Sequence, residues 1–207
     1  MTELILVRHG QTHGNVAGRW EGWSEDTLTS LGRAQAGALG RRLADEFGSG
    51  EVAALYTSPL ARAFETACII GAPLGLQPVS VDDLREINFG ELNGITLEGM
   101  EAQHPALFAR WKNKADMEFE WPGGERRIDF FRRVAGACDL ILASHPRGRV
   151  VIVAHGGTLR ACLAHLLRGQ MGEWWGYTLD NCGLTRVGVE GDGARLLVLN
   201  DGVHLPE

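Results

Sequence analysis

Runs of apolar residues alternate along the chain with stretches in which apolar positions recur at helical spacing. Two runs, residues 4–7 and 150–154, are continuous and of strand length, and a third begins at Leu55. Continuous apolar runs of this kind are typical of strands buried on both faces. Strands that alternate with helices predict an α/β fold, a three-layer α/β/α sandwich with a mostly parallel central sheet. The expected helices cover about residues 30–47, 60–74 and 125–143.

Local signals place the ends of some of these elements. Thr29 can cap the first expected helix with its hydroxyl, and Gly48 follows that helix as a stop. Near the C-terminus, residues 182–189 and 194–199 flank the turn-forming sequence 190–193, which predicts an antiparallel pair of strands. This pair would close one edge of the sheet.

The chain has no internal repeat, low-complexity tract or linker-like segment, so we expect a single domain over residues 1–207. Its least regular part, about residues 87–124, is rich in aromatic and charged residues and is a candidate lid or insertion. Trp174 and Trp175 could line a cleft or fill the core, and packing in the core is the favoured interpretation.

Candidate chemistry begins where the first apolar run ends, at Arg8-His9-Gly10. Open α/β sheets bind their ligands at the carboxyl ends of the strands, so these side chains fall where a ligand is expected. Arg8 offers a permanent positive charge, and His9 offers a nucleophile or proton carrier near neutral pH. The tripeptide alone is equally compatible with a strand end that carries a surface arginine and a structural histidine.

A second apolar run also ends in a histidine, at His155-Gly156-Gly157, and a helix-like stretch follows. The N-terminus of such a helix directs free backbone N–H groups toward an anion. Arg62 lies in the first turn of the expected helix 60–74, and Glu86 lies in a glycine-punctuated segment. Two strands that both end in histidine are difficult to explain as two core histidines, so the pattern favours an anion site.

These motifs resemble the histidine phosphatase superfamily, in the branch that contains cofactor-dependent phosphoglycerate mutases and related small phosphatases. The resemblance runs from Glu3 to about Arg160 and implies a phosphoglycerate mutase-like fold. Six pieces occur in the family's order, which makes the signal specific although no single piece is decisive. They are Arg8-His9-Gly10, Asn15, Gly22-Trp23 with Leu28-Thr29 and Gly32, Ser58 to Ala63, Leu84-Arg85-Glu86, and His155-Gly156-Gly157.

The resemblance implies a role for each matched residue. His9 would attack phosphorus and form a phosphohistidine, as a neutral imidazole favoured by nearby guanidinium charges. Glu86 would protonate the leaving oxygen and later deprotonate water. The expected catalytic residues are His9, Glu86, His155, Arg8 and Arg62, and the expected substrate-binding residues are Arg8, Asn15, Gly22, Arg62 and Gly156.

Each of these roles has a plainer alternative. Asn15 could cap a short helix. Arg62 could pair with Glu65 on an exposed helix face. Glu86 could be an ordinary solvated glutamate, and its assignment rests on its motif.

The composition of the chain argues against several classes of binding partner. A net charge of −6 over 207 residues gives no basic surface for nucleic acid, so positive charge must be concentrated locally if phosphate binds. No apolar run is long enough to span a membrane, and the strand pattern begins without a signal-like segment. The four cysteines are widely spaced, which favours reduced thiols in the cytoplasm over a disulfide framework or a metal site. We expect no metal and no cofactor, and no pattern specifies an oligomeric state.

Departures from the mutases favour hydrolysis of a small phosphomonoester. Phe89 stands where mutases have a tyrosine, Leu97 where they have a lysine, and Glu21 where they have a threonine. The arginine pair of the mutases is at best partly matched by Lys112-Asn113. A mutase needs donors for the carboxylate of its substrate, and these positions supply few. Mutase activity is the alternative function. A non-catalytic phosphate-binding regulatory protein is the third, which retention of all the catalytic positions disfavours.

Overall fold

The computed structural model describes residues 1–48, 50–167, 171–191 and 193–206. Its centre is a six-stranded sheet in the order β4-β3-β6-β1-β7-β8. The first four strands in this order are parallel, and β7 runs antiparallel to both β1 and β8. The strands are β1 (Thr2–Arg8), β3 (Val52–Thr57), β4 (Val79–Ser80), β6 (Gly148–Ala154), β7 (Leu184–Glu190) and β8 (Gly193–Asp201).

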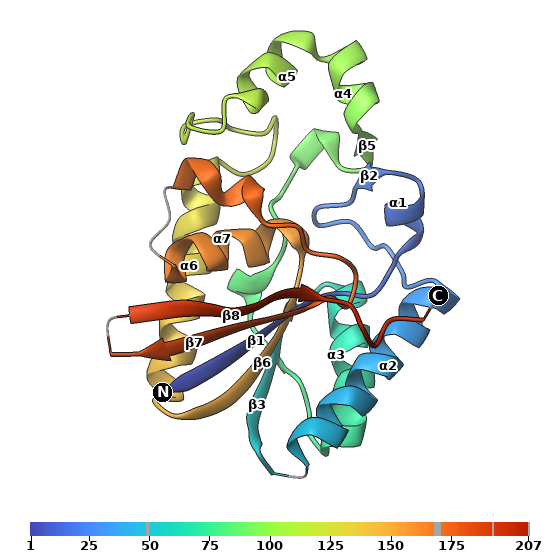
Figure 1. Cartoon of the computed structure of the whole chain (residues 1–207). Helices are drawn as coiled ribbons and strands as arrows, with labels where there is room; N and C mark the ends of the chain where they lie inside the picture. The colour runs from blue at the N-terminus through green and yellow to red at the C-terminus, as the bar shows by residue number, and fades with distance from the viewer. Residues whose placement is uncertain (49, 168–170, 192, 207) are drawn as a thin grey trace.

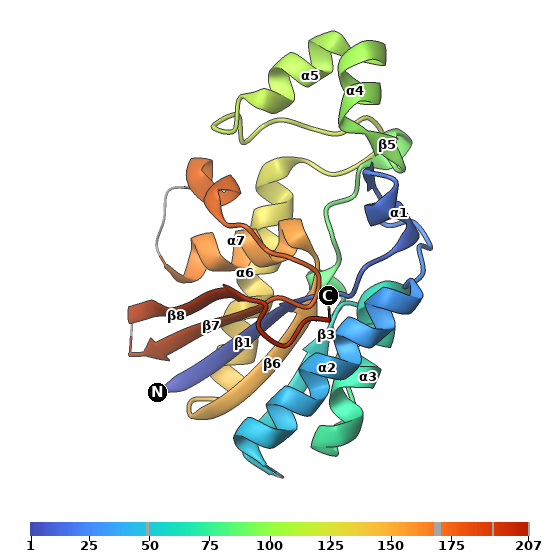
Figure 2. The same ribbon diagram turned by 45° about the vertical axis from the view of Figure 1, so that its right-hand side comes forward.

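Helices cover both faces of this sheet. On one face, α2 (Ser30–Phe47) and α3 (Ala61–Leu74) pack over one buried apolar cluster. On the other face, α6 (Arg127–Ser144) and α7 (Gly156–Leu166) pack over a second, larger cluster. Figures 1 and 2 show the two helix pairs on opposite sides of the strands. The predicted three-layer α/β/α sandwich with a mostly parallel sheet is therefore confirmed.

The two longest apolar runs form neighbouring central strands. β1 and β6 pair in parallel with Arg8 opposite Ala154, and the residues of their apolar stretches are 0% exposed. Full burial on both faces explains why these runs are continuous rather than alternating. Because the pairing is in register up to this last pair, His9 and His155 leave the sheet side by side.

Local signals placed α2 correctly. The helix spans Ser30–Phe47, the Thr29 hydroxyl accepts a hydrogen bond from Gly32 N–H at 3.0 Å, and Gly48 ends the helix at φ +66°. The expected helix 60–74 corresponds to α3, and the expected helix 125–143 corresponds to α6 shifted by about one or two residues. The predicted closing pair is β7 and β8; Asp192 in its turn lies outside the described residues.

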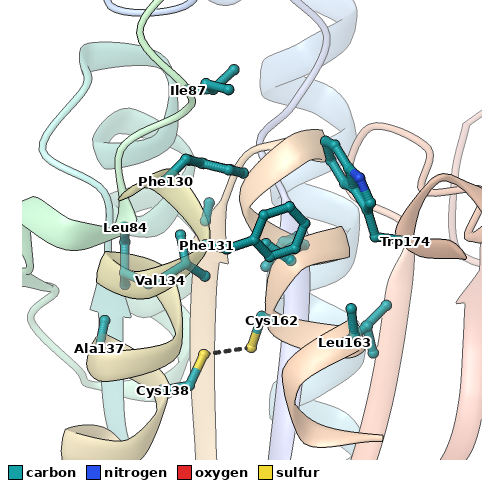
Figure 3. Packing of buried hydrophobic residues seen from close by; sticks show 14 of the residues in the cluster. Leu84, Ile87, Phe130, Phe131, Val134, Ala137, Cys138, Cys162, Leu163 and Trp174 are labelled. Carbon is teal, nitrogen blue, oxygen red and sulfur yellow. Dashed lines mark hydrogen bonds between the residues drawn. The ribbon is translucent and has the colours of Figure 1, made fainter. Parts of the chain in front are cut away.

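Helices α6 and α7 pack against each other on one face of the sheet. Cys138 and Cys162 lie on facing turns with their sulfurs 2.7 Å apart, and both are free thiols (Figure 3). Phe131 packs edge-on against Trp174 at a centroid distance of 5.1 Å. Trp174 is 2% exposed and packs in the core as expected, and one side of it also borders the cavity described below.

Residues 87–124 stand beyond the end of the sheet in both overall views (Figures 1 and 2). β5 pairs with β2, and Arg127 at the start of α6 donates to the backbone carbonyls of Trp111, Asn113 and Asp116. These bonds connect the end of the segment 87–124 to α6, while a lid function stays a prediction.

The small elements are α1 (His13–Val16), β2 (Arg19–Trp20), η1 (Asp82–Leu84), η2 (Gly90–Leu92), β5 (Ile95–Thr96), α4 (Leu97–Gln103), α5 (Pro105–Lys112) and η3 (Met171–Gly176). Among the described helices, none has both the length and the apolar character needed to cross a membrane.

Candidate active site

A cavity of about 340 Å³ opens at the carboxyl ends of β1 and β6. Seven of the eight sequence-predicted site residues line it, and the eighth, His155, lies against the ring of His9. The site therefore gathers residues from positions 8 to 156 of the chain. The seven are Arg8, His9, Asn15, Gly22, Arg62, Glu86 and Gly156.

His9 has one ring nitrogen fixed and the other available. Its Nδ1 lies 2.8 Å from the carbonyl oxygen of Gly10, which can only accept, so Nδ1 carries the proton. The backbone N–H of His9 donates to Ala154 O at 2.9 Å and extends the β1–β6 ladder by one bond. Because Nδ1 holds the proton of a neutral ring, Nε2 carries a free lone pair.

The environment keeps both histidines neutral. Burial lowers the pKa of His9 well below its ordinary value, and the charges of Arg62 and Arg8 lower that pKa further. Burial also lowers the pKa of His155 well below its ordinary value, with Arg62 as the next cause. The two residues are 4% and 1% exposed. A neutral imidazole is the nucleophilic form, which agrees with the expectation from the neighbouring guanidinium groups.

His155 forms the buried wall beside His9. Their ring centroids lie 5.2 Å apart in an edge-on arrangement. His155 Nε2 is 2.8 Å from the hydroxyl of Ser58, while its Nδ1 is buried with no hydrogen-bond partner within the described parts of the chain. Ser58 was not singled out as a site residue, although it belongs to the Ser58 to Ala63 motif that could have identified it.

Two arginines approach the histidines from different elements. Arg8 donates from Nη1 to Leu179 O at 2.8 Å, and its buried Nε has no acceptor among the residues described. Arg62, on α3, is 2% exposed and donates to the carbonyls of Gly22 at 2.6 Å and Ser24 at 3.1 Å. The alternative pairing of Arg62 with Glu65 is wrong in this structure, because Glu65 instead binds Arg33 at 2.6 Å.

Asn15 supports a helix start and belongs to the site. Thr12 is the N-cap of α1, and Asn15, three residues later, completes the capping box, so the plainer alternative is right only in part. Its Oδ1 also accepts a hydrogen bond from Asn181 Nδ2 at 3.0 Å, and the same nitrogen donates to His9 O at 2.8 Å. Since Oδ1 is occupied by donors, the amide nitrogen of Asn15 is the atom suited to donate to an anion. Asn181 has no motif around it, so sequence reasoning missed it.

Glu86 is fixed by donors from two directions. Its Oε2 accepts from the Gly157 N–H at 2.9 Å, and its Oε1 accepts from the Ile87 N–H at 3.0 Å. Gly157 lies in the first turn of α7, whose N-terminal dipole favours a carboxylate. A Cβ at position 157 would overlap the Glu86 carboxylate, so a larger residue there would displace this carboxylate from its present position. Glu86 is thus a held group of the cavity rather than a solvated surface glutamate.

Two residues that the motifs did not identify complete the site. Arg133, on α6, donates to the backbone carbonyls of Asp83, Arg85 and Glu86 at 2.8, 2.8 and 2.9 Å, and so positions the segment that carries Glu86. Arg160, on α7, lines the cavity and donates to a backbone carbonyl at 2.8 Å. It lies one helical turn after Gly156, a spacing that could have revealed it. Among the described residues, five arginines line the cavity together with the carboxylates of Glu21 and Glu86, an excess of positive charge suited to a phosphate dianion. The five are Arg8, Arg19, Arg62, Arg127 and Arg160.

Known proteins match this chain over almost its full length. Phosphoserine phosphatase 1 of Hydrogenobacter thermophilus is 30% identical over 207 residues, which cover 100% of this chain and 96% of the relative. The structure of YhfR from Bacillus stearothermophilus has 31% identity and a TM-score of 0.88, with 100% of both chains covered. A mycobacterial glucosyl-3-phosphoglycerate phosphatase, solved with VO3, has 32% identity and a TM-score of 0.85, covering 96% of this chain and 98% of that one.

The family match spans residues 4–202, which include every residue described above as part of the site. Relatives named as phosphatases of small phosphorylated compounds agree with a cavity built around histidines and arginines. The chain therefore belongs to the histidine phosphatase superfamily, branch 1, and is a phosphomonoesterase.

Proposed function

We propose that the chain hydrolyses small phosphomonoesters through a phosphohistidine formed on His9. The observation that supports the proposal most directly is the protonation pattern of the His9 ring and its place in the cavity. Its proton is held on Nδ1 by Gly10 O, its Nε2 is free, and it shares one cavity with Arg8 and Arg62. Phosphoryl transfer needs such a nucleophile together with cations around the phosphate oxygens.

In the first step, His9 Nε2 attacks phosphorus and a nitrogen–phosphorus bond forms. The bond between phosphorus and the alcohol oxygen breaks at the same time. That oxygen leaves as an alcohol because Glu86, in its carboxylic acid form, gives it a proton. The products of this step are the free alcohol, a phosphorylated His9 and an ionised Glu86.

In the second step, water replaces the alcohol. Glu86 takes a proton from the water as its oxygen attacks phosphorus, and the nitrogen–phosphorus bond breaks. Inorganic phosphate leaves with a neutral His9 and a protonated Glu86. One carboxyl group serves both steps. The hydrogen bonds from the Gly157 and Ile87 N–H groups keep that carboxyl group in position for each of them.

The remaining predicted residues hold the phosphate. Arg8 and Arg62 neutralise its charge, and the Asn15 amide adds an uncharged donor. His155 lies beside the nucleophile with an Nδ1 that no described residue occupies, and the N–H groups at Gly156 lie at the start of α7, where an anion is favoured. Gly22 contributes its carbonyl, which fixes the direction of the Arg62 fork.

The names of relatives suggest compact phosphorylated substrates, because one is a phosphoserine phosphatase and another a glucosyl-3-phosphoglycerate phosphatase. We propose a cytoplasmic location, because the wide spacing of the four cysteines in the sequence favours reduced thiols over a disulfide framework. Cell fractionation with an antibody to the chain tests this assignment, and recovery outside the cytoplasmic fraction would reject it.

The test of the mechanism compares wild type with His9→Ala and with His165→Ala as a control. His165 is a partly exposed histidine on α7 that binds Asp139 at 2.7 Å and does not line the cavity. We expect His9→Ala to lose nearly all phosphate release and His165→Ala to retain it. Rapid quenching of the wild type should trap an acid-labile, base-stable phosphoenzyme. Retained turnover in His9→Ala would show that another group is the nucleophile.

A further inference from the structure

The cavity has a second half that the phosphate chemistry does not use. Six aromatic rings line it, drawn from segments that are distant in the sequence and that meet only in the fold. Neighbouring rings have centroid distances between 4.1 and 5.8 Å, so they form one continuous surface, here called the aromatic arc. The aromatic arc consists of Trp20, Phe89, Trp111, Trp121, Trp174 and Trp175.

The arc is joined directly to the catalytic end of the cavity. Phe89 follows Glu86 by three residues and packs on Trp121 at a centroid distance of 4.8 Å. Trp111, on α5, meets Trp175, on η3, at 5.7 Å and links the segment 87–124 to the body of the fold. A phosphate held beside His9 therefore directs its alcohol portion toward these rings, because both ends share the same cavity.

Apolar surface in a cavity is costly unless a ligand covers it. Trp121 and Trp174 are each 2% exposed, but Trp20, Phe89, Trp111 and Trp175 are only partly buried, and their free surface faces a common space. A compact zwitterion such as serine would leave most of this surface uncovered. A flat apolar group would cover it, and aromatic rings add a favourable stacking or edge-on contact.

Arginines outnumber carboxylates in the described lining of the cavity, where only Glu21 and Glu86 are acidic, and this balance disfavours a cationic occupant. Lys114 Nζ lies 3.0 Å from the ring centroid of Trp111 and 4.1 Å from that of Trp175. Arg160 lies 5.7 Å from the ring of Trp175, and Arg19 also lines the cavity. Burial lowers the pKa of Lys114 to about 7, whereas Arg19 and Arg160 are permanent cations with which a substrate ammonium group would have to compete. A neutral aromatic group meets no such competition.

We propose that the aromatic arc binds the alcohol portion of the substrate, and that this portion carries a flat, neutral aromatic group. The inference rests on the proposed function, because the arc would act on the leaving group of a phosphomonoester hydrolysed at His9. A cavity of about 340 Å³ lies within the range that holds a small organic ligand. The arc thereby selects arylalkyl phosphates over phosphate esters of small polar alcohols.

The experiment compares four phosphomonoesters of primary alcohols: 2-phenylethyl phosphate, 2-cyclohexylethyl phosphate, ethyl phosphate and phosphoserine. All are alkyl esters, so their leaving groups differ far less in acidity than alkyl and aryl esters do. We expect kcat/KM for 2-phenylethyl phosphate to exceed that for ethyl phosphate and for phosphoserine by at least about tenfold, with 2-cyclohexylethyl phosphate between them. Equal values for all four esters would overturn the inference.

Variants locate the effect. Trp111→Ala should reduce the preference for 2-phenylethyl over ethyl phosphate to about twofold, while Trp111→Phe should keep most of it. Phe108→Leu is the matched control, because Phe108 lies on the same helix and stacks on Trp111 at 5.6 Å but does not line the cavity. This control should retain the wild-type preference. A uniform loss on both esters in Trp111→Ala would indicate a structural role and contradict the proposal.

Binding without turnover separates the inference from the proposed function. We would use 3-phenylpropylphosphonate, in which a methylene group replaces the bridging oxygen, and follow tryptophan fluorescence with propylphosphonate as the control ligand. Tighter binding of the phenyl compound to wild type, lost in Trp175→Leu, supports the arc even if no ester releases phosphate, an outcome that would reject only the proposed hydrolysis. Equal affinity for the two phosphonates would reject the arc.

Discussion

The backbone N–H of Gly157 donates to the carboxylate of Glu86 at 2.9 Å, and a Cβ on residue 157 would overlap that carboxylate where it now lies. A glycine on α7 thus fixes an acid carried by a segment 71 residues earlier in the chain. Glu86 is additionally reached by the Thr158 hydroxyl at 3.4 Å, so the first turn of α7 surrounds this carboxylate. The chemistry proposed for Glu86 therefore depends on a position that carries no reactive group.

Replacing Gly157 with alanine should displace the Glu86 carboxylate while leaving His9 in place. We expect kcat to fall by about 100-fold, because a displacement of about 1 Å in a catalytic group can cost that much. Burst formation of the phosphoenzyme from an aryl ester should persist, since an aryl leaving group needs little protonation. Gly136→Ala on α6 is the control, because a Cβ there meets nothing within 4 Å. A Gly157→Ala enzyme with wild-type kcat on alkyl esters would contradict the assignment.

Glu86→Gln removes the proton that Glu86 is proposed to transfer and keeps the size of the side chain. Alkyl phosphates have poor leaving groups, so their hydrolysis should slow by about 10²- to 10⁴-fold, the usual worth of general acid catalysis. Aryl phosphates should slow much less. Steady-state kinetics on one alkyl and one aryl ester measure the difference. Equal losses on both would mean that Glu86 positions the substrate instead of moving a proton.

Stability should fall as the pH is lowered through the range set by the buried histidines. The pKa values of His9 and His155 are lowered in the folded protein, so the unfolded chain binds more protons below about pH 6.5. The contribution is fully present above pH 6.5 and is lost as the pH falls toward the folded values, by up to about 1.4 kcal/mol per pH unit for each histidine. Urea unfolding at pH 7.5, 6.5 and 5.5 measures the slope. His155→Gln should reduce it, and an unchanged slope in that variant would contradict the assignment.

Hydrolysis should exceed isomerisation of phosphoglycerate. Glu21, Phe89 and Leu97 line the cavity, as the departures from the mutases predict, and Lys112 does not line it. Weak retention of the dephosphorylated product lets water reach the phosphohistidine. The test measures 2-phosphoglycerate formed from 3-phosphoglycerate, primed with 2,3-bisphosphoglycerate, beside phosphate release from a panel of phosphomonoesters. Isomerisation with the higher kcat/KM would reverse this ranking and direct attention to Arg19 and Arg160 as carboxylate donors.

Activity should survive exhaustive treatment with EDTA. In the proposed site the phosphate charge is neutralised by Arg8, Arg62 and Arg160, so the reaction as written has no step that requires a divalent cation. Phosphate release before and after chelation, with the protein's folding checked by circular dichroism, measures the effect. A loss of activity that Mg²⁺, Mn²⁺ or Zn²⁺ restores would refute the expectation.

The features that the sequence predicted well depend on neighbouring residues. The continuous burial of residues 4–7, the Thr29 cap and the register of β1 with β6 follow from apolar period, capping chemistry and strand pairing, all of which are local or repeated along an element. The side chains at the ends of those strands could then be placed together without knowledge of the loops. Seven of the eight predicted site residues line one cavity for this reason.

The features that escaped prediction depend on contacts between distant, unpatterned segments. Asn181 reaches His9 across 172 positions, and Arg133 reaches the Glu86 carbonyl across 47. For Trp174 and Trp175 the core was favoured over a cleft, but both line the cavity; the place of Trp175 depends on α5 approaching η3. Periodicity places a residue on a face of its own element, but it does not specify which remote backbone carbonyl or ring will lie opposite.

The two carbonyls that hold Arg62 have a consequence for how phosphate is bound. The bonds to Gly22 and Ser24 engage one hydrogen on each terminal nitrogen, and the guanidinium retains further hydrogens that point elsewhere. A long side chain that becomes ordered only on binding would lose about 2 kcal/mol of rotamer entropy at that moment. Arg62 loses this entropy when the chain folds, so phosphate meets a preorganised fork. The affinity for inorganic phosphate therefore depends partly on the shape of the loop at residues 22–24, although the carbonyls of this loop bind Arg62 and not the anion.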